Sequence, residues 1–69
     1  MSLVAALIEL NLADIEDRAA KSEAMRRGSS ATQPLTAARL RELCELGEMM
    51  MRTGKRRAAA LARARALGA

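Results

Sequence analysis

The sequence predicts an all-α protein: a two-helix antiparallel hairpin that is oligomeric or bound to a partner. Of its 69 residues, 51% are hydrophobic and none is aromatic, and the dominant types are strong helix formers such as Ala, Leu, Glu and Arg. Gly, Ser and Pro gather in one short stretch only, which marks a single loop. We therefore expect one domain over residues 1–69.

The small size of the chain predicts that the hairpin completes its core with another chain. A domain of this length buries a modest fraction of its surface and usually needs a disulfide, a metal or an oligomeric partner. Cys44 is the only cysteine and histidine is absent, which excludes an internal disulfide and makes a structural zinc site very unfavourable. Association with another chain is the remaining way to stabilise the hairpin.

The first helix is expected over about residues 2–27, with Ser2 as its N-cap. At 100° per residue, its apolar side chains form one broad face: Val4, Leu7, Ile8, Ile15 and Ala19. Asn11 lies within that face. Two interpretations stay open for it, a polar position tolerated at an edge or a buried Asn that sets the register of an oligomeric seam.

The loop is expected over residues 28–35. Gly28 suits a left-handed helix C-cap, because glycine adopts positive φ without a steric cost. Arg26 and Arg27 precede it in the last helical turn, where positive charge complements the helix dipole.

The second helix is expected over about residues 36–67, with Thr36 as its N-cap. A break near Gly54, giving three helices, is the alternative. We favour a continuous helix, since apolar and small residues then stay on one face without a phase shift. Because this helix is the longer one, its basic end is expected to project beyond the hairpin.

The apolar faces of the two helices together predict the interaction face of the protein. Its residues are Leu7, Ile8, Ile15, Leu40, Leu43, Gly47, Met50, Gly54, Ala58 and Leu61. The small members of the set, such as Gly47 and Gly54, would let another helix approach closely.

Charge is distributed unevenly along the chain. Residues 1–25 carry five acidic and two basic residues, whereas residues 26–69 carry ten basic and three acidic ones. The two halves are complementary, which predicts that the helices lie against each other in this chain or in a neighbour. A basic stripe of the second helix predicts contacts with phosphates or with an acidic partner: Arg52, Lys55, Arg56 and Arg63.

The sequence offers no set of residues for catalysis. Without histidine, nothing is available to activate Cys44, so we expect a small buried hydrophobe there rather than a nucleophile. No catalytic residue, metal ligand, cofactor or small-molecule substrate is expected. The apolar stretch from Leu3 is interrupted by Glu9 and is too short to span a bilayer. We expect a cytoplasmic protein, with export without a cleaved signal left open.

One architecture resembles this chain. A helix, a short loop with Ser and Pro between Gly28 and Leu35, and then a longer helix resemble the small helical-hairpin proteins of type III secretion systems. These are the needle subunits and their co-chaperones. The resemblance implies a helical hairpin that is held by protein partners, and it transfers no functional residue.

These observations favour a non-catalytic protein–protein interaction module, acting as a subunit, assembly factor or small chaperone in a larger complex. The alternative is a small dimeric helical protein that binds nucleic acid through its basic C-terminal helix. That alternative lacks aromatic side chains for stacking on bases.

Overall fold

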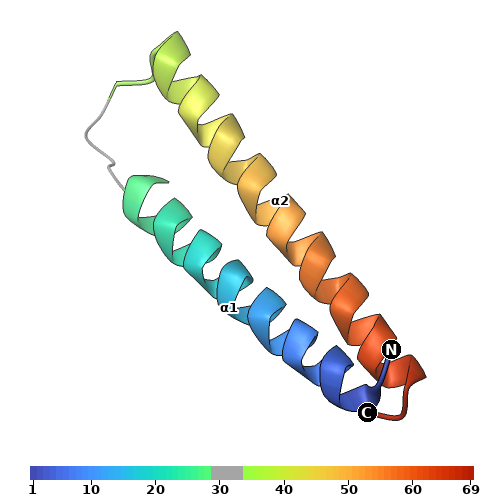
Figure 1. Cartoon of the computed structure of the whole chain (residues 1–69). Helices are drawn as coiled ribbons and strands as arrows, with labels where there is room; N and C mark the ends of the chain where they lie inside the picture. The colour runs from blue at the N-terminus through green and yellow to red at the C-terminus, as the bar shows by residue number, and fades with distance from the viewer. Residues whose placement is uncertain (29–33) are drawn as a thin grey trace.

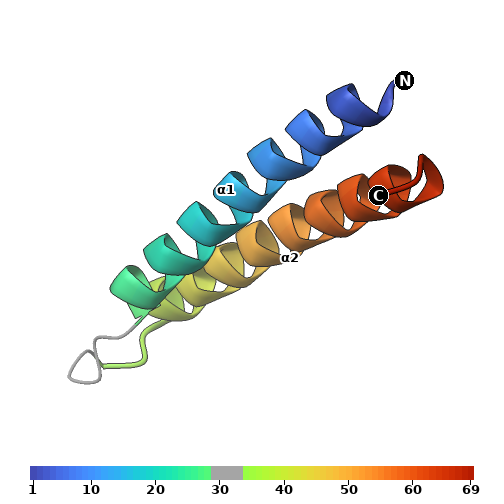
Figure 2. The same ribbon diagram turned by 90° about the horizontal axis from the view of Figure 1, so that it is seen from below.

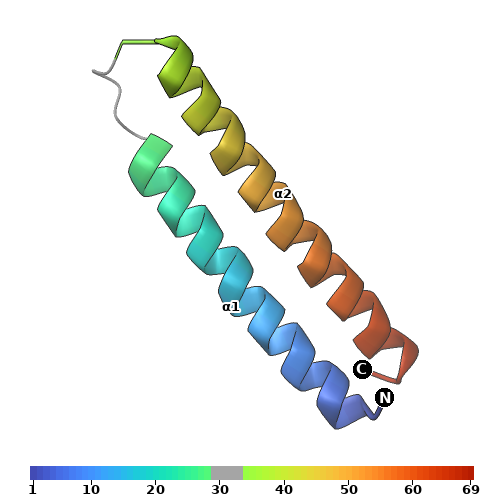
Figure 3. The same cartoon turned by 45° about the horizontal axis from the view of Figure 1, so that its top comes forward.

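The computed structural model describes residues 1–28 and 34–69 and shows two long helices. Helix α1 spans Leu3–Gly28 and helix α2 spans Ala37–Ala66. They run antiparallel along their whole length, with both chain termini at the same end, in two views of the ribbon (Figures 1 and 3). The molecule is elongated, with extents of 49 × 16 × 12 Å. The predicted all-α hairpin is confirmed.

Side-chain caps begin both helices, as predicted. The Ala5 amide donates to Ser2 Oγ at 3.1 Å, and the Arg39 amide donates to Thr36 Oγ1 at 3.1 Å. Each cap satisfies an amide that has no partner in the first turn of a helix. The sequence therefore located both helix starts to within one residue.

The ends of the helices differ from the prediction. Gly28 is the last residue of α1 and does not have positive φ, so the predicted left-handed cap is wrong. Of the rest of the predicted loop, residues 29–33 lie outside the described residues, and Pro34 and Leu35 precede α2 without being helical. Positive φ occurs instead at Gly68, at 104°. There the Ala69 amide donates to the Ala64 carbonyl at 3.0 Å and the Gly68 amide to the Arg65 carbonyl at 3.1 Å, the Schellman arrangement that closes α2.

Helix α2 continues through Gly54 without a break, as the view in Figure 2 also shows. The continuous helix is confirmed, and the third helix is not formed. A glycine inside a helix costs about 1 kcal/mol relative to alanine. Contacts on either side of Gly54 offset this cost, because Thr53 bonds to Asp17 and Arg57 pairs with Asp14 on α1.

Alanine fills the seam between the helices. Among the described residues, the buried hydrophobic set consists of six alanines and one leucine: Ala6, Ala13, Ala20, Ala24, Leu46, Ala60 and Ala64. The first three are spaced seven residues apart, the repeat by which two helices keep one face in contact. Because alanine ends at Cβ, the two backbones approach closely. We call these seven residues the alanine seam.

The alanine seam is not the apolar face that the sequence predicted for the first helix. Two large side chains of that predicted face, Ile8 and Ile15, point away from α2, at 58% and 55% exposure. The physical reason is the flanking charge: with alanines facing inwards, Glu9 and Glu16 come within reach of arginines on α2.

One carboxylate interrupts the alanine seam. Asp17 is only 3% exposed, and its Oδ1 accepts a hydrogen bond from the Thr53 hydroxyl at 3.1 Å. Lys21 Nζ lies 2.9 Å from the other carboxylate oxygen. The hydrogen bond from Lys21, together with that from Thr53, lowers the pKa of Asp17 below its ordinary value of 3.8. The buried charge is therefore paired on both oxygens.

We expect Ala13→Leu to destabilise the hairpin by about 1–3 kcal/mol, because three added carbons in a close-packed seam force the helices apart. The measurement is urea unfolding followed by circular dichroism. Ala5→Leu is the matched control, since Ala5 lies on the same helix and is exposed. Equal stability of the two variants would show that the seam is not tightly packed.

Acid is expected to weaken the hairpin partly through Asp17. Because folding lowers the pKa of this group, the unfolded chain binds the proton more readily, and stability falls as the pH drops below 3.8 towards the folded-state pKa. Unfolding measured across this range should show a shallower loss for Asp17→Asn than for the original chain. Glu48→Gln, at an exposed position, should leave the slope unchanged. A slope unaffected by Asp17→Asn would contradict this assignment.

Candidate functional site

Large apolar side chains cover the face of α1 that points away from α2. Val4, Ile8, Leu12 and Ile15 are between 55% and 67% exposed. Their spacing of four, four and three residues places them on one face, and at 100° per residue this face is opposite Ala6 and Ala13. We call these four residues the outer stripe. Leu12 was not predicted, although its place four residues after Ile8 was a usable signal.

None of the ten residues of the predicted interaction face is buried in the hairpin. On α1, Leu7, Ile8 and Ile15 are exposed. On α2, three are exposed and four are half-buried: Leu40, Met50 and Ala58, then Leu43, Gly47, Gly54 and Leu61. The hairpin therefore leaves six residues of the predicted face exposed and partly covers the other four.

The two halves of the predicted interaction face meet at one edge of the hairpin. There Leu7 and Leu61 line the same shallow pocket, together with Leu10, Asn11, Asp14 and Arg57. Asn11 is exposed at this edge, so within a single hairpin it is a polar edge position and not a buried seam residue.

The glycines of the predicted interaction face do not serve the contact between α1 and α2. A Cβ atom built on Gly47 or on Gly54 would meet no neighbouring atom within 4 Å. Within this chain, close helix approach depends on the alanine seam. A close approach at Gly47 or Gly54 would need a second chain.

Two of the four residues of the predicted basic stripe form ion pairs within the chain itself. Arg56 Nη1 lies 2.6 Å from Glu16 Oε2, and Arg63 Nη1 lies 2.6 Å from Glu9 Oε2. Arg52 and Lys55 make no ion pair with any of the described residues. The complementary halves of the sequence thus meet within one molecule. The expected projection of the basic end is wrong, because the last turns of α2 lie beside the first turns of α1.

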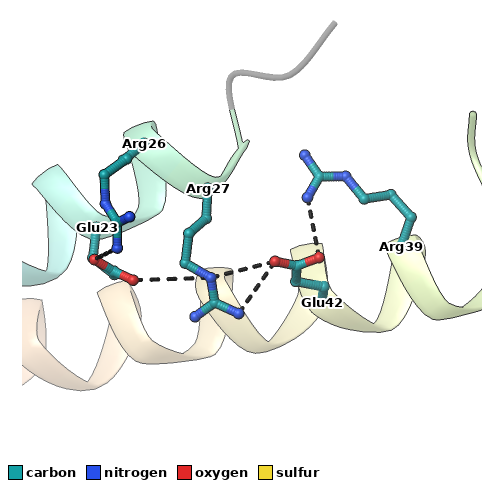
Figure 4. A network of polar contacts seen from close by, with 5 residues as sticks. All are labelled: Glu23, Arg26, Arg27, Arg39 and Glu42. Carbon is teal, nitrogen blue, oxygen red and sulfur yellow. Dashed lines mark hydrogen bonds and ion pairs between the residues drawn. The ribbon is translucent and has the colours of Figure 1, made fainter. Parts of the chain in front are cut away.

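A second charged cluster ties the helices together at the loop end (Figure 4). Glu42 accepts hydrogen bonds from Arg39 at 3.1 Å and from Arg27 of α1 at 3.2 Å, and Glu23 pairs with Arg26. The hydrogen bond from Arg39, and then that from Arg27, lowers the pKa of Glu42. The bond from Arg26 similarly lowers the pKa of Glu23. The cluster therefore joins the end of α1 to the start of α2 through Arg27 and Glu42.

Cys44 is exposed, so the expectation of a buried hydrophobe is wrong; it lies on the face of α2 that points away from α1. Residues 1–28 and 34–69 contain no cluster of three acidic or cysteine side chains that could hold a metal ion. Neither described helix is long and apolar enough to cross a membrane.

No protein-family model, curated protein or solved structure matches this sequence.

Exchanging the charges of one cross-helix pair should show that it aligns the helices. Glu9→Arg places two arginines together and is expected to lower the free energy of unfolding by about 0.5–1 kcal/mol. Adding Arg63→Glu should restore most of that loss, because the pair is rebuilt with reversed polarity. Thermal unfolding of both variants measures the effect, with Glu48→Arg as the control. The absence of any restoration would mean that the pair contributes nothing in solution.

Proposed function

We propose that this chain is a non-catalytic protein–protein interaction module: a helical hairpin that presents α1 to another protein chain within a larger complex. Its role is that of a subunit, an assembly factor or a small chaperone. The observation that carries the proposal is the outer stripe, a row of four large apolar side chains that the fold leaves in water.

The hairpin does not depend on the outer stripe for its own packing. The buried apolar residues belong to the alanine seam on the opposite side of α1, and capping bonds and ion pairs satisfy the polar groups. Apolar residues spaced by three and four on an exposed helix are the anchors by which helices enter partner grooves. A row of this kind, which is not needed for folding, supports a role in binding.

Nucleic-acid binding has less support than protein binding. Of the four basic residues predicted to contact phosphates, Arg56 and Arg63 are paired with carboxylates of α1. Binding phosphate through them would require breaking these pairs. Type III secretion and a cytoplasmic location stay predictions from the sequence, and an assembly factor is compatible with both.

The proposal predicts that a charge in the outer stripe abolishes association without unfolding the hairpin. Ile8→Lys places an ammonium group in the middle of the stripe, and Ala62→Lys, on the exposed outer side of α2, is the matched control. The native mass of the full chain is measured by sedimentation, for the purified protein and for the complex isolated from its host. We expect the original chain to form an assembly heavier than the 7.4 kDa monomer. Ile8→Lys should dissociate this assembly and Ala62→Lys should not, and both variants should keep their helicity in circular dichroism.

A folded monomer in both preparations, or an assembly insensitive to Ile8→Lys, would overturn the proposal. If Ile8→Lys reduces helicity, Ile15→Lys near the other end of the outer stripe repeats the test. A chain that binds duplex DNA and loses this binding in Arg52→Ala would favour the nucleic-acid alternative.

A further inference from the structure

The outer stripe and two of its neighbours, Leu7 and Asn11, together have a symmetric spacing, although the four stripe residues alone do not. With the neighbouring Leu7 and Asn11 included, its positions are 4, 7, 8, 11, 12 and 15. When two such helices lie antiparallel with their midpoint between residues 9 and 10, each position of this set lies level with another position of the set in the other helix. Val4 then comes level with Ile15, and Leu7 with Leu12. A surface that maps onto itself in this way is what a two-fold interface between identical chains requires.

Charge does not oppose the approach of two α1 helices. The outer stripe itself contains no charged side chain. The acidic residues beside it, Glu9 and Glu16, are already paired with Arg63 and Arg56 of their own hairpin. Two copies can therefore bring these faces together without placing unpaired carboxylates against each other.

The whole elongated chain also exposes more surface than a compact monomer of its mass. The chain exposes 5134 Å², whereas a folded monomer of 7.4 kDa exposes about 4200 Å². The excess of about 900 Å² is close to the roughly 800 Å² that each partner contributes to a stable interface.

We infer that the outer stripe docks on the outer stripe of a second copy of this chain, with the two α1 helices antiparallel about a two-fold axis between residues 9 and 10. The inference rests on the proposed function and names its partner. Asn11 and its copy then lie about 4.5 Å apart along the helix direction, within reach of an amide–amide hydrogen bond. That bond gives Asn11 a register-setting role in the dimer.

Cysteine cross-linking of the full chain distinguishes this geometry from others. All variants carry Cys44→Ser, which removes the exposed native thiol. A Val4→Cys chain is mixed with an Ile15→Cys chain of different mass in a glutathione redox buffer, and the disulfide-linked products are quantified by mass spectrometry. We expect the mixed product to exceed the Val4→Cys homodimer at least tenfold. In the inferred dimer, residue 4 lies level with residue 15 of the other copy and far from residue 4 of that copy. Ala62→Cys, on the outer side of α2, is the control for random collision.

A dominant Val4→Cys homodimer would indicate parallel helices and overturn the inference. So would cross-linking no greater than that of Ala62→Cys. As an independent measure, Ile8→Lys should raise the dimer dissociation constant at least about 100-fold, since each dimer loses two buried isoleucines.

The two proposals fail in different ways. A chain that is monomeric when pure, but binds a different host protein through the outer stripe, refutes self-association and leaves the interaction module intact. A chain that is monomeric and recruits nothing refutes both. A dimer that Ile8→Lys dissociates and that gives the mixed disulfide supports both.

Discussion

The close approach of the two helices along the alanine seam is the constraint on which the rest of this structure depends. Ala6, Ala13 and Ala20 place no atom beyond Cβ between the backbones, so the helices lie near enough for side chains on the flanks to reach across. Arginines of α2 then meet carboxylates of α1 at several levels, as Glu9 and Glu16 show. Larger residues in the seam would have moved these groups apart and left both charged helices unpaired.

The same constraint explains why apolar surface remains outside. Alanine buries little area, and each exposed ion pair contributes little to stability. The large apolar side chains that would enlarge a core, such as Ile8 and Ile15, are on the opposite face of α1, where one hairpin cannot use them. Folding and the proposed association thus use two different faces of one helix. This separation allows a surface variant to affect one without the other.

Much of the fold could be predicted from the sequence because its signals are local. Ser2 and Thr36 mark helix starts through their own side chains, and the unbroken pattern through Gly54 reflects a single helix. Which face of each helix packs against the other could not be predicted from local signals, because it depends on alanine packing and on charge pairs between the two helices. Residues of the predicted interaction face are nevertheless not buried, because they keep the same repeat of seven in a different phase from the alanine seam.

The repeat of seven in the alanine seam has a consequence for alignment. Leu46, Thr53 and Ala60 on α2 also repeat every seven residues, so a slip of one helix by seven would bring the same faces of the two helices together, and the repeat alone does not fix the alignment. Asp17 can choose. Its carboxylate meets the hydroxyl of Thr53, and a slip by one repeat in either direction would set this carboxylate against Leu46 or Ala60, which offer no hydrogen bond. A single buried polar pair thus favours one alignment among those that the repeat of seven allows.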